Sequence, residues 1–175
     1  MSDAVLRAAT RADAPALADL ARRSFAATYV PTHDAGRIRI HCETVLSDPA
    51  VAAWFDVPDA RIAVAVGQSA LLGYVQWQPA DAPIPAWRPV ELKRLYVDPA
   101  ALGGGLGQRL FDHVRDGARA QGADLLWLCV YAGNARARRF YARRGLVEIG
   151  RVPYRFVDQV EDDLALGLRF TPAPP

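Results

Sequence analysis

The segment Leu102-Gly103-Gly104-Gly105-Leu106-Gly107 is a glycine-rich turn between two regular elements. The residues before it, Glu91–Val97, have the composition of a β-strand, and the residues from Gly105 to about Gln121 have helical periodicity. A glycine-rich turn at this point leaves backbone N–H groups exposed at the positive end of the helix dipole, where anions bind. The segment therefore predicts a site for a phosphate-bearing ligand without identifying that ligand.

Strands and helices alternate on both sides of this segment. The pattern predicts a helix capped by Thr10 and further helices over Gly36–Leu46, Gly105–Gln121 and Asn134–Arg144. The predicted strands are Val5–Ala9, Arg61–Val66, Leu71–Trp77, Glu91–Val97, Leu125–Val130, Leu146–Val152 and Leu164–Leu168. This order is typical of an α/β fold with a mixed central sheet of about seven strands flanked by about four helices. We expect a single domain over residues 1–170 and a disordered tail over 171–175.

The composition gives no indication of nucleic acid, a membrane or a metal as a partner. The chain has 175 residues, of which 51% are hydrophobic and 23% charged, and its net charge of +2 gives no case for nucleic acid or membrane binding. Cys42 and Cys129 lack the spacing of metal ligands, and we expect surface or capping roles for His33, His41 and His113. The sequence shows no signal-peptide pattern and no apolar run of membrane-spanning length. We therefore expect a cytoplasmic protein without a metal.

Two well-known nucleotide loops fit the glycine-rich segment poorly. A P-loop ends in Gly-Lys-Ser/Thr, whereas Gly107 is followed by Gln108 and Arg109. A Rossmann loop has G-x-G-x-x-G spacing after a first strand, whereas these glycines have G-x-G-x-G spacing after the fourth predicted strand. A plain turn with extra glycines is the remaining alternative. The absence of acidic residues from Gly105 to Arg109 instead favours a bound anion, because acids are normally preferred in a first helical turn.

Three segments, in order and spacing, resemble the GNAT superfamily of acetyl-CoA-dependent N-acetyltransferases. Leu95-Tyr96-Val97-Asp98-Pro99 is similar to the end of that family's central strand, and residues 102–107 are similar to its R/Q-x-x-G-x-G/A pyrophosphate loop. Asn134-Ala135-Arg136-Ala137-Arg138-Arg139-Phe140-Tyr141-Ala142-Arg143-Arg144-Gly145-Leu146 is similar to its N-x-x-A-x-x-F-Y-x-x-x-G-F segment. The resemblance implies a GNAT-like (acyl-CoA N-acyltransferase) fold with acetyl-CoA as co-substrate. One position departs from the pattern, because Leu102 stands where the family usually has Arg or Gln.

The resemblance also implies which residues hold and use the coenzyme. The implied binding residues are Leu95, Tyr96, Val97, Leu102, Gly103, Gly104, Gly105, Leu106, Gly107, Gln108, Asn134 and Tyr141. The backbone of Leu95–Val97 would pair with the pantetheine amides, the loop amides would hold the pyrophosphate, and Arg109 could replace part of the missing cation. Tyr141 would be the general acid for the leaving thiolate. The alternatives are an aromatic core residue beside Phe140 for Tyr141 and a helix N-cap for Asn134.

Glu91 is the second predicted catalytic residue. It precedes Val97 by six positions, so both side chains lie on one face of the predicted strand. Some GNAT members carry a catalytic glutamate here, which acts on the amine directly or through water. The alternatives are an exposed carboxylate at a strand end and a carboxylate that attracts a cationic substrate.

The resemblance implies a small-molecule amine as acceptor, bound by aromatic side chains. The candidate lining residues are Phe25, Tyr29, Trp77, Trp87, Tyr154 and Phe156. The acidic segment 154–164 and residues 25–29 are similar to bacterial spermidine/spermine N-acetyltransferases, which implies a polyamine held by charge and cation–π contacts. A polar hairpin tip is the alternative for the acidic segment. A non-catalytic acyl-CoA-binding regulatory module and an N-terminal peptide or protein acetyltransferase stay open as other functions, and the resemblance also implies a homodimer.

Overall fold

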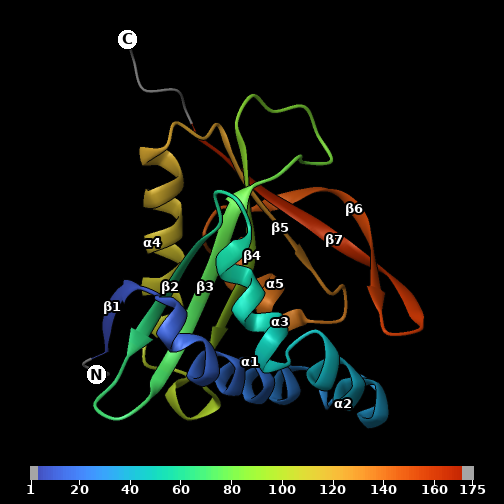
Figure 1. The fold of residues 1–175 in the computed structure, drawn as a ribbon. Helices are drawn as coiled ribbons and strands as arrows, with labels where there is room; N and C mark the ends of the chain where they lie inside the picture. Colours follow the sequence, from blue (N-terminus) through green and yellow to red (C-terminus); the bar gives the residue numbers. More distant parts are fainter. Residues whose placement is uncertain (1–3, 171–175) are drawn as a thin grey trace. The chain divides into compact units, whose positions relative to one another are not determined.

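The computed structural model describes residues 4–170, so the predicted tail over 171–175 lies outside the described residues (Figure 1). The strands are β1 (Val5–Ala8), β2 (Arg61–Val66), β3 (Leu71–Pro79), β4 (Pro89–Val97), β5 (Leu125–Val130), β6 (Val147–Phe156) and β7 (Gln159–Arg169). The α-helices are α1 (Ala14–Tyr29), α2 (Ala35–Thr44), α3 (Asp48–Ala52), α4 (Leu106–Ala120) and α5 (Ala135–Ala142). Short 3₁₀ turns are η1 (Arg11–Asp13), η2 (Ala53–Asp56) and η3 (Pro99–Ala101).

The chain forms two compact units that share one strand and one helix. Unit 1 contains residues 1–77 and 94–113, and unit 2 contains residues 78–93 and 114–175. The boundaries cut through β4 and α4, so each unit receives part of both elements. The single domain expected over residues 1–170 stays a prediction.

Unit 1 is built on antiparallel strands. β1 pairs with β2 through Val5↔Val66, and β2 pairs with β3 through Ala63↔Val75. At the end of β4, the Asp98 amide donates to the Leu72 carbonyl at 2.8 Å, which ties this strand end to β3. On α1 of this unit, Leu17, Leu20 and Ala21 are completely buried.

Unit 2 combines parallel and antiparallel pairs. The first half of β4 runs parallel to β5, with Glu91 opposite Trp127, and β5 runs antiparallel to β7, with Leu128 opposite Leu166. β6 and β7 form a long antiparallel hairpin. Over the described residues the strand order is β1-β2-β3-β4-β5-β7-β6, which confirms the predicted α/β fold with a mixed sheet of seven strands.

Close packing on Gly73 fixes the start of α4 in unit 1. A Cβ at this position would lie 2.8 Å from Leu110 Cδ1 and 3.0 Å from the Tyr96 carbonyl oxygen, closer than real Cβ contacts. Leu106 and Leu110 of α4 are both buried. Because α4 packs so closely on β3 here, the glycine-rich turn that leads into it has a defined position.

The structure differs from the sequence prediction most clearly over residues 48–52 and in the C-terminal hairpin. Residues Asp48–Ala52 form a helix that was not predicted, with the Ser47 hydroxyl accepting from the Ala50 amide and Pro49 in the first turn. Proline is well tolerated there, because the first amides of a helix have no internal acceptor. In the C-terminal hairpin, β6 continues to Phe156 and β7 begins at Gln159, so the acidic segment forms the ends of both strands as well as the tip.

No helix of the described residues is long and apolar enough to cross a membrane.

Candidate active site

The glycine-rich turn in unit 1 has the backbone geometry that its sequence requires. Gly103 has φ +84° and Gly105 has φ +78°, in the left-handed region that favours glycine. A Cβ at either position would meet no atom within 4 Å, so open space lies beside the backbone. The glycines therefore give the turn its shape and leave its outer side clear for a ligand.

The amides of this turn are suited to an anion. Among the described residues, no group accepts a hydrogen bond from the backbone amides of Gly103–Gly107. The first turn of α4 contains no acidic residue, so nothing opposes the positive end of its dipole. Leu102 and Gln108 are exposed beside the turn. These residues fit a pyrophosphate held by backbone N–H groups.

Arg109, which the sequence suggested as a replacement cation for the turn, has a backbone partner in unit 1. Its Nη2 donates to the Ala4 carbonyl oxygen at 2.7 Å, at the beginning of the described chain. The role of a replacement cation for the loop stays a prediction. The turn is instead steadied by Asp98, whose carboxylate accepts from the Ala100 amide at 2.9 Å and pairs with Arg23 of α1 at 3.0 Å.

The predicted acceptor residues Phe25 and Tyr29 belong to a cluster of rings in unit 1. Their ring centroids lie 4.5 Å apart, and Phe25 also stacks on His41 of α2 at 4.3 Å with an interplanar angle of 14°. Tyr96 of β4 lies 6.5 Å from Phe25. We call the aromatic cluster the seven rings connected in this way, namely Phe25, Tyr29, His33, His41, Trp54, Tyr74 and Tyr96.

The surface or capping role expected for His41 is wrong. The residue is 5% exposed, and its ring packs against Phe25. Burial lowers its pKa from 6.5 to about 4, with a further contribution from the positive charge of Arg94. His41 is therefore neutral at physiological pH.

This buried histidine predicts a pH-dependent stability. As the pH falls below 6.5 the unfolded chain binds a proton first, whereas the folded chain binds it only near pH 4. The free energy of unfolding should therefore fall by up to about 3 kcal/mol as the pH drops through this window. Above pH 6.5 His41 is neutral in both states, so it causes no such loss there. Urea unfolding of the wild type and His41→Phe between pH 7 and pH 4.5 measures the difference. Parallel stability curves for the two proteins would contradict the assignment.

Unit 2 contains the predicted acid Tyr141, on α5. It is 8% exposed, and its ring lies 5.1 Å from that of Phe140 at an interplanar angle of 83°. Asn134 caps the same helix, because its Oδ1 accepts from the Ala137 amide at 3.0 Å. The N-cap alternative for Asn134 is therefore confirmed, and the cap fixes the start of the helix that carries Tyr141.

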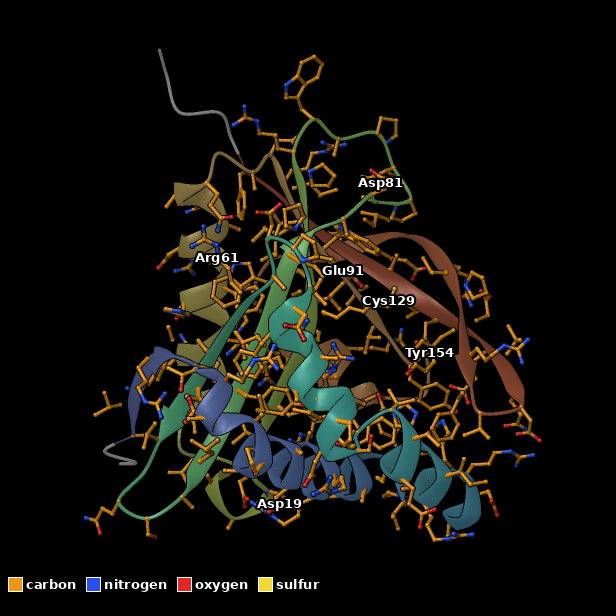
Figure 2. The ribbon with its side chains drawn as sticks, in the orientation of Figure 1. Asp19, Arg61, Asp81, Glu91, Cys129 and Tyr154 are labelled. Carbon is orange, nitrogen blue, oxygen red and sulfur yellow. The ribbon has the colours of Figure 1, made fainter. Side chains whose placement is uncertain are left out.

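Glu91 lies on β4 inside unit 2 and is 7% exposed, so the alternative of an exposed strand-end carboxylate is wrong. Lys93 Nζ lies 3.1 Å from Glu91 Oε1 and is its ion-pair partner. Figure 2 shows Glu91 and Cys129, which come from the neighbouring strands β4 and β5. Burial, followed by the carboxylates of Glu91 and Asp163, raises the pKa of the Cys129 thiol to about 11. This thiol is therefore protonated at physiological pH, which makes it a poor nucleophile.

The other predicted acceptor residues have different surroundings. Trp77 is 5% exposed and its ring lies 5.5 Å from His113 in unit 1, while Phe156 is 2% exposed in unit 2. Tyr154 is exposed on β6 (Figure 2), and Trp87 is 89% exposed. In the acidic hairpin Asp162 pairs with Arg151 at 3.1 Å, and Asp163 is buried. The structure thus brings Phe25 and Tyr29 together in unit 1, and Trp87, Tyr154 and Phe156 belong to unit 2.

Sequence reasoning missed Arg94, which lies in the middle of β4. Its guanidinium lies 4.0 Å from the centroid of the Trp54 ring and donates to Gln76 Oε1 at 2.6 Å. The available signal was its alternation with Tyr96 on one face of the strand, which placed both on the same side as the buried Leu92.

Among the described residues there is no group of three or more His, Cys, Asp or Glu side chains that could hold a metal ion.

Comparison with known proteins gives consistent matches along most of the chain. Residues 18–146 match the acetyltransferase (GNAT) family. An uncharacterised N-acetyltransferase of Mycobacterium tuberculosis is 30% identical over 154 residues, which cover 88% of this chain and 96% of that protein. A GCN5-related N-acetyltransferase structure from Rhodopseudomonas palustris has a TM-score of 0.77 at 20% identity, covering 97% of this chain and 98% of that one. The PaiA N-acetyltransferase of Thermoplasma acidophilum, solved in complex with coenzyme A, has a TM-score of 0.75 at 19% identity, covering 96% and 99%.

Proposed function

Because the chain belongs to the acetyltransferase (GNAT) family, we propose that it transfers an acetyl group from acetyl-CoA to a primary amine by direct attack. The observation that carries the proposal is the glycine-rich turn, whose amides have no acceptor among the described residues and whose glycines leave open space beside them. A similar fold has been solved with coenzyme A in the Thermoplasma acidophilum protein. The turn is the part of this chain suited to the pyrophosphate of such a ligand.

The proposed reaction needs three groups from the protein. The amine nitrogen attacks the thioester carbonyl carbon, the C–S bond breaks, and the sulfur leaves as a thiolate that takes up a proton. Glu91 removes the proton from the amine, directly or through water, and its burial supports a strong electrostatic influence there. Tyr141 donates a proton to the thiolate. The Val97 amide stabilises the carbonyl oxygen, and the backbone of Leu95–Val97 orients the pantetheine arm.

The identity of the acceptor is a separate question. A polyamine stays a prediction, supported by the acidic composition of the β6–β7 hairpin and weakened by the pairing of Asp162 with Arg151 and the burial of Asp163. An N-terminal peptide or protein acceptor and a non-catalytic acyl-CoA-binding module remain alternatives. The cytoplasmic location and the homodimer are proposals as well, and sedimentation equilibrium tests the second.

Thiol release from acetyl-CoA tests the activity itself. The purified chain is mixed with acetyl-CoA and a panel of polyamines, aminoglycosides, amino acids and N-terminal peptides, and free thiol is measured over time. We expect release with at least one class of amine and an acetylated product by mass spectrometry. Coenzyme binding without release from any amine would favour the non-catalytic module.

Glu91→Gln is expected to lower kcat/KM by a factor that depends on pH. At pH 7 the amine is mostly protonated, so removing the proton acceptor should lower kcat/KM about tenfold with the best acceptor. The loss should shrink toward pH 9.5, where solvent deprotonates more of the amine. Glu148→Gln on β6 is the matched control, because it removes an exposed carboxylate of unit 2. A loss of equal size at every pH would assign Glu91 a structural role.

A further inference from the structure

Arg94 is a half-buried cation with an unusual set of partners. Its guanidinium faces the Trp54 ring at 4.0 Å and donates to Gln76 Oε1 at 2.6 Å. Trp54 is 7% exposed and Gln76 is 2% exposed, so both partners are themselves held by the core of unit 1. The Trp54 ring thus holds one face of the guanidinium, and Gln76 holds one of its edges.

The contacts of Arg94 do not include a carboxylate. Among the described residues no Asp or Glu forms an ion pair with it, and its neighbours are a neutral amide and aromatic rings. Arg22, another half-buried arginine of unit 1, does have such a partner in Asp48 at 2.8 Å. A guanidinium carries five N–H donors, and withdrawing its charge from water is costly unless an anion compensates it.

The surroundings of Arg94 keep other positive charge away. His41 stays neutral at physiological pH, partly because of the charge of Arg94 itself. Tyr74 is fully buried and lies 5.6 Å from Tyr96, which completes an uncharged aromatic environment next to the cation. The aromatic cluster therefore borders one fixed positive charge, that of Arg94.

We propose that Arg94 and the aromatic cluster recognise a carboxylate on the acceptor, so that the substrate is an amine that also carries a carboxyl group, such as an amino acid. The inference rests on the proposed acetyl transfer, and it uses Phe25 and Tyr29, two residues already predicted to line the acceptor site. A planar carboxylate matches the free edge of a guanidinium through paired hydrogen bonds, whereas a polyamine would be repelled. The rings would contact the apolar part of such an acceptor.

Matched acceptors that differ only in the carboxylate test this specificity. We would measure kcat/KM for L-phenylalanine and L-phenylalaninamide, for 4-aminobutyrate and n-butylamine, and for spermidine. We expect the carboxylate member of at least one pair to be preferred about tenfold or more, and Arg94→Gln to abolish that preference. Arg61→Gln removes an exposed cation from β2 of the same unit and should leave the preference unchanged. A preference for spermidine, or a preference that survives Arg94→Gln, would overturn the inference while acetyl transfer stands.

A binding measurement keeps the inference testable apart from turnover. Calorimetric titration with N-acetyl-L-phenylalanine, as a carboxylate-bearing product, and with its amide should show binding of the acid alone to the wild type. Arg94→Gln should weaken this binding about tenfold or more, and Arg61→Gln should not. Equal binding of acid and amide would contradict the inference. Loss of thiol release with every amine would contradict the proposed function instead, so the two failures are distinguishable.

Discussion

Tyr141→Phe is expected to lower kcat by about 10²–10³-fold while leaving the dissociation constant of coenzyme A unchanged. The substitution removes one hydroxyl and keeps the ring, which is 8% exposed and packs edge-on against Phe140. Folding should therefore be preserved, because the volume of the side chain hardly changes. What is lost is the donor that protonates the departing thiolate, a contribution made in the transition state and not in the bound ground state.

The measurement combines steady-state thiol release with calorimetric titration of coenzyme A. Tyr131→Phe provides a matched control, since it removes a tyrosine hydroxyl from the same unit just after β5. An unchanged kcat in Tyr141→Phe would show that Tyr141 is only an aromatic core residue. Weaker coenzyme binding with the same kcat would assign the hydroxyl to ligand binding and leave the acid unidentified.

Features that depend on short stretches of backbone were predictable from the sequence. The glycine-rich turn follows from residues 102–107 alone, because positive φ at Gly103 and Gly105 requires glycine. The helix capped by Asn134 was predictable for the same reason, since the cap and its acceptor amide are three residues apart. The alternation of Leu164, Leu166 and Leu168 likewise predicted a strand, which the structure confirms within β7.

Features that depend on tertiary contacts were not predictable. Glu91 is buried because the first half of β4 pairs with β5, and nothing in residues 91–97 indicates that pairing. Arg94 meets Gln76, which lies 18 positions earlier on β3, and Trp54, which lies in a 3₁₀ turn that the sequence did not indicate. His41 occupies a helix with weak amphipathic character, so its burial against Phe25 could not be inferred. Arg94 and the burial of His41 were therefore missed, although two rings of the aromatic cluster, Phe25 and Tyr29, were singled out from the sequence.

The second large effect is expected from a substitution in the glycine-rich turn, Gly105→Pro. Gly105→Pro should weaken coenzyme A binding by about 10²-fold or more, because proline fixes φ near −65° whereas Gly105 has φ +78°. The substitution also removes one N–H from the turn and disturbs the Gly105 carbonyl, which accepts from the Gln108 and Arg109 amides at the start of α4. Both changes displace the amides proposed to hold the pyrophosphate.

Two milder substitutions separate this effect from a general disturbance of the loop. Gly104→Ala should bind coenzyme A normally, since Gly104 does not have a positive φ and a Cβ there would lie 3.8 Å from the Ala101 carbonyl oxygen, an ordinary contact. Leu102→Ala should also have little effect if backbone amides and not the Leu102 side chain hold the ligand.

A ligand without the pyrophosphate identifies which contact is lost. The affinity of S-acetylpantetheine should be the same for Gly105→Pro and the wild type, because the substitution acts on the amides that face the phosphates. Circular dichroism would establish whether the variant is folded. An equal loss of affinity for coenzyme A and S-acetylpantetheine would place the effect outside the pyrophosphate contact. A full retention of coenzyme A affinity would show that the glycine-rich turn is not the phosphate site, which would remove the observation that carries the proposed function.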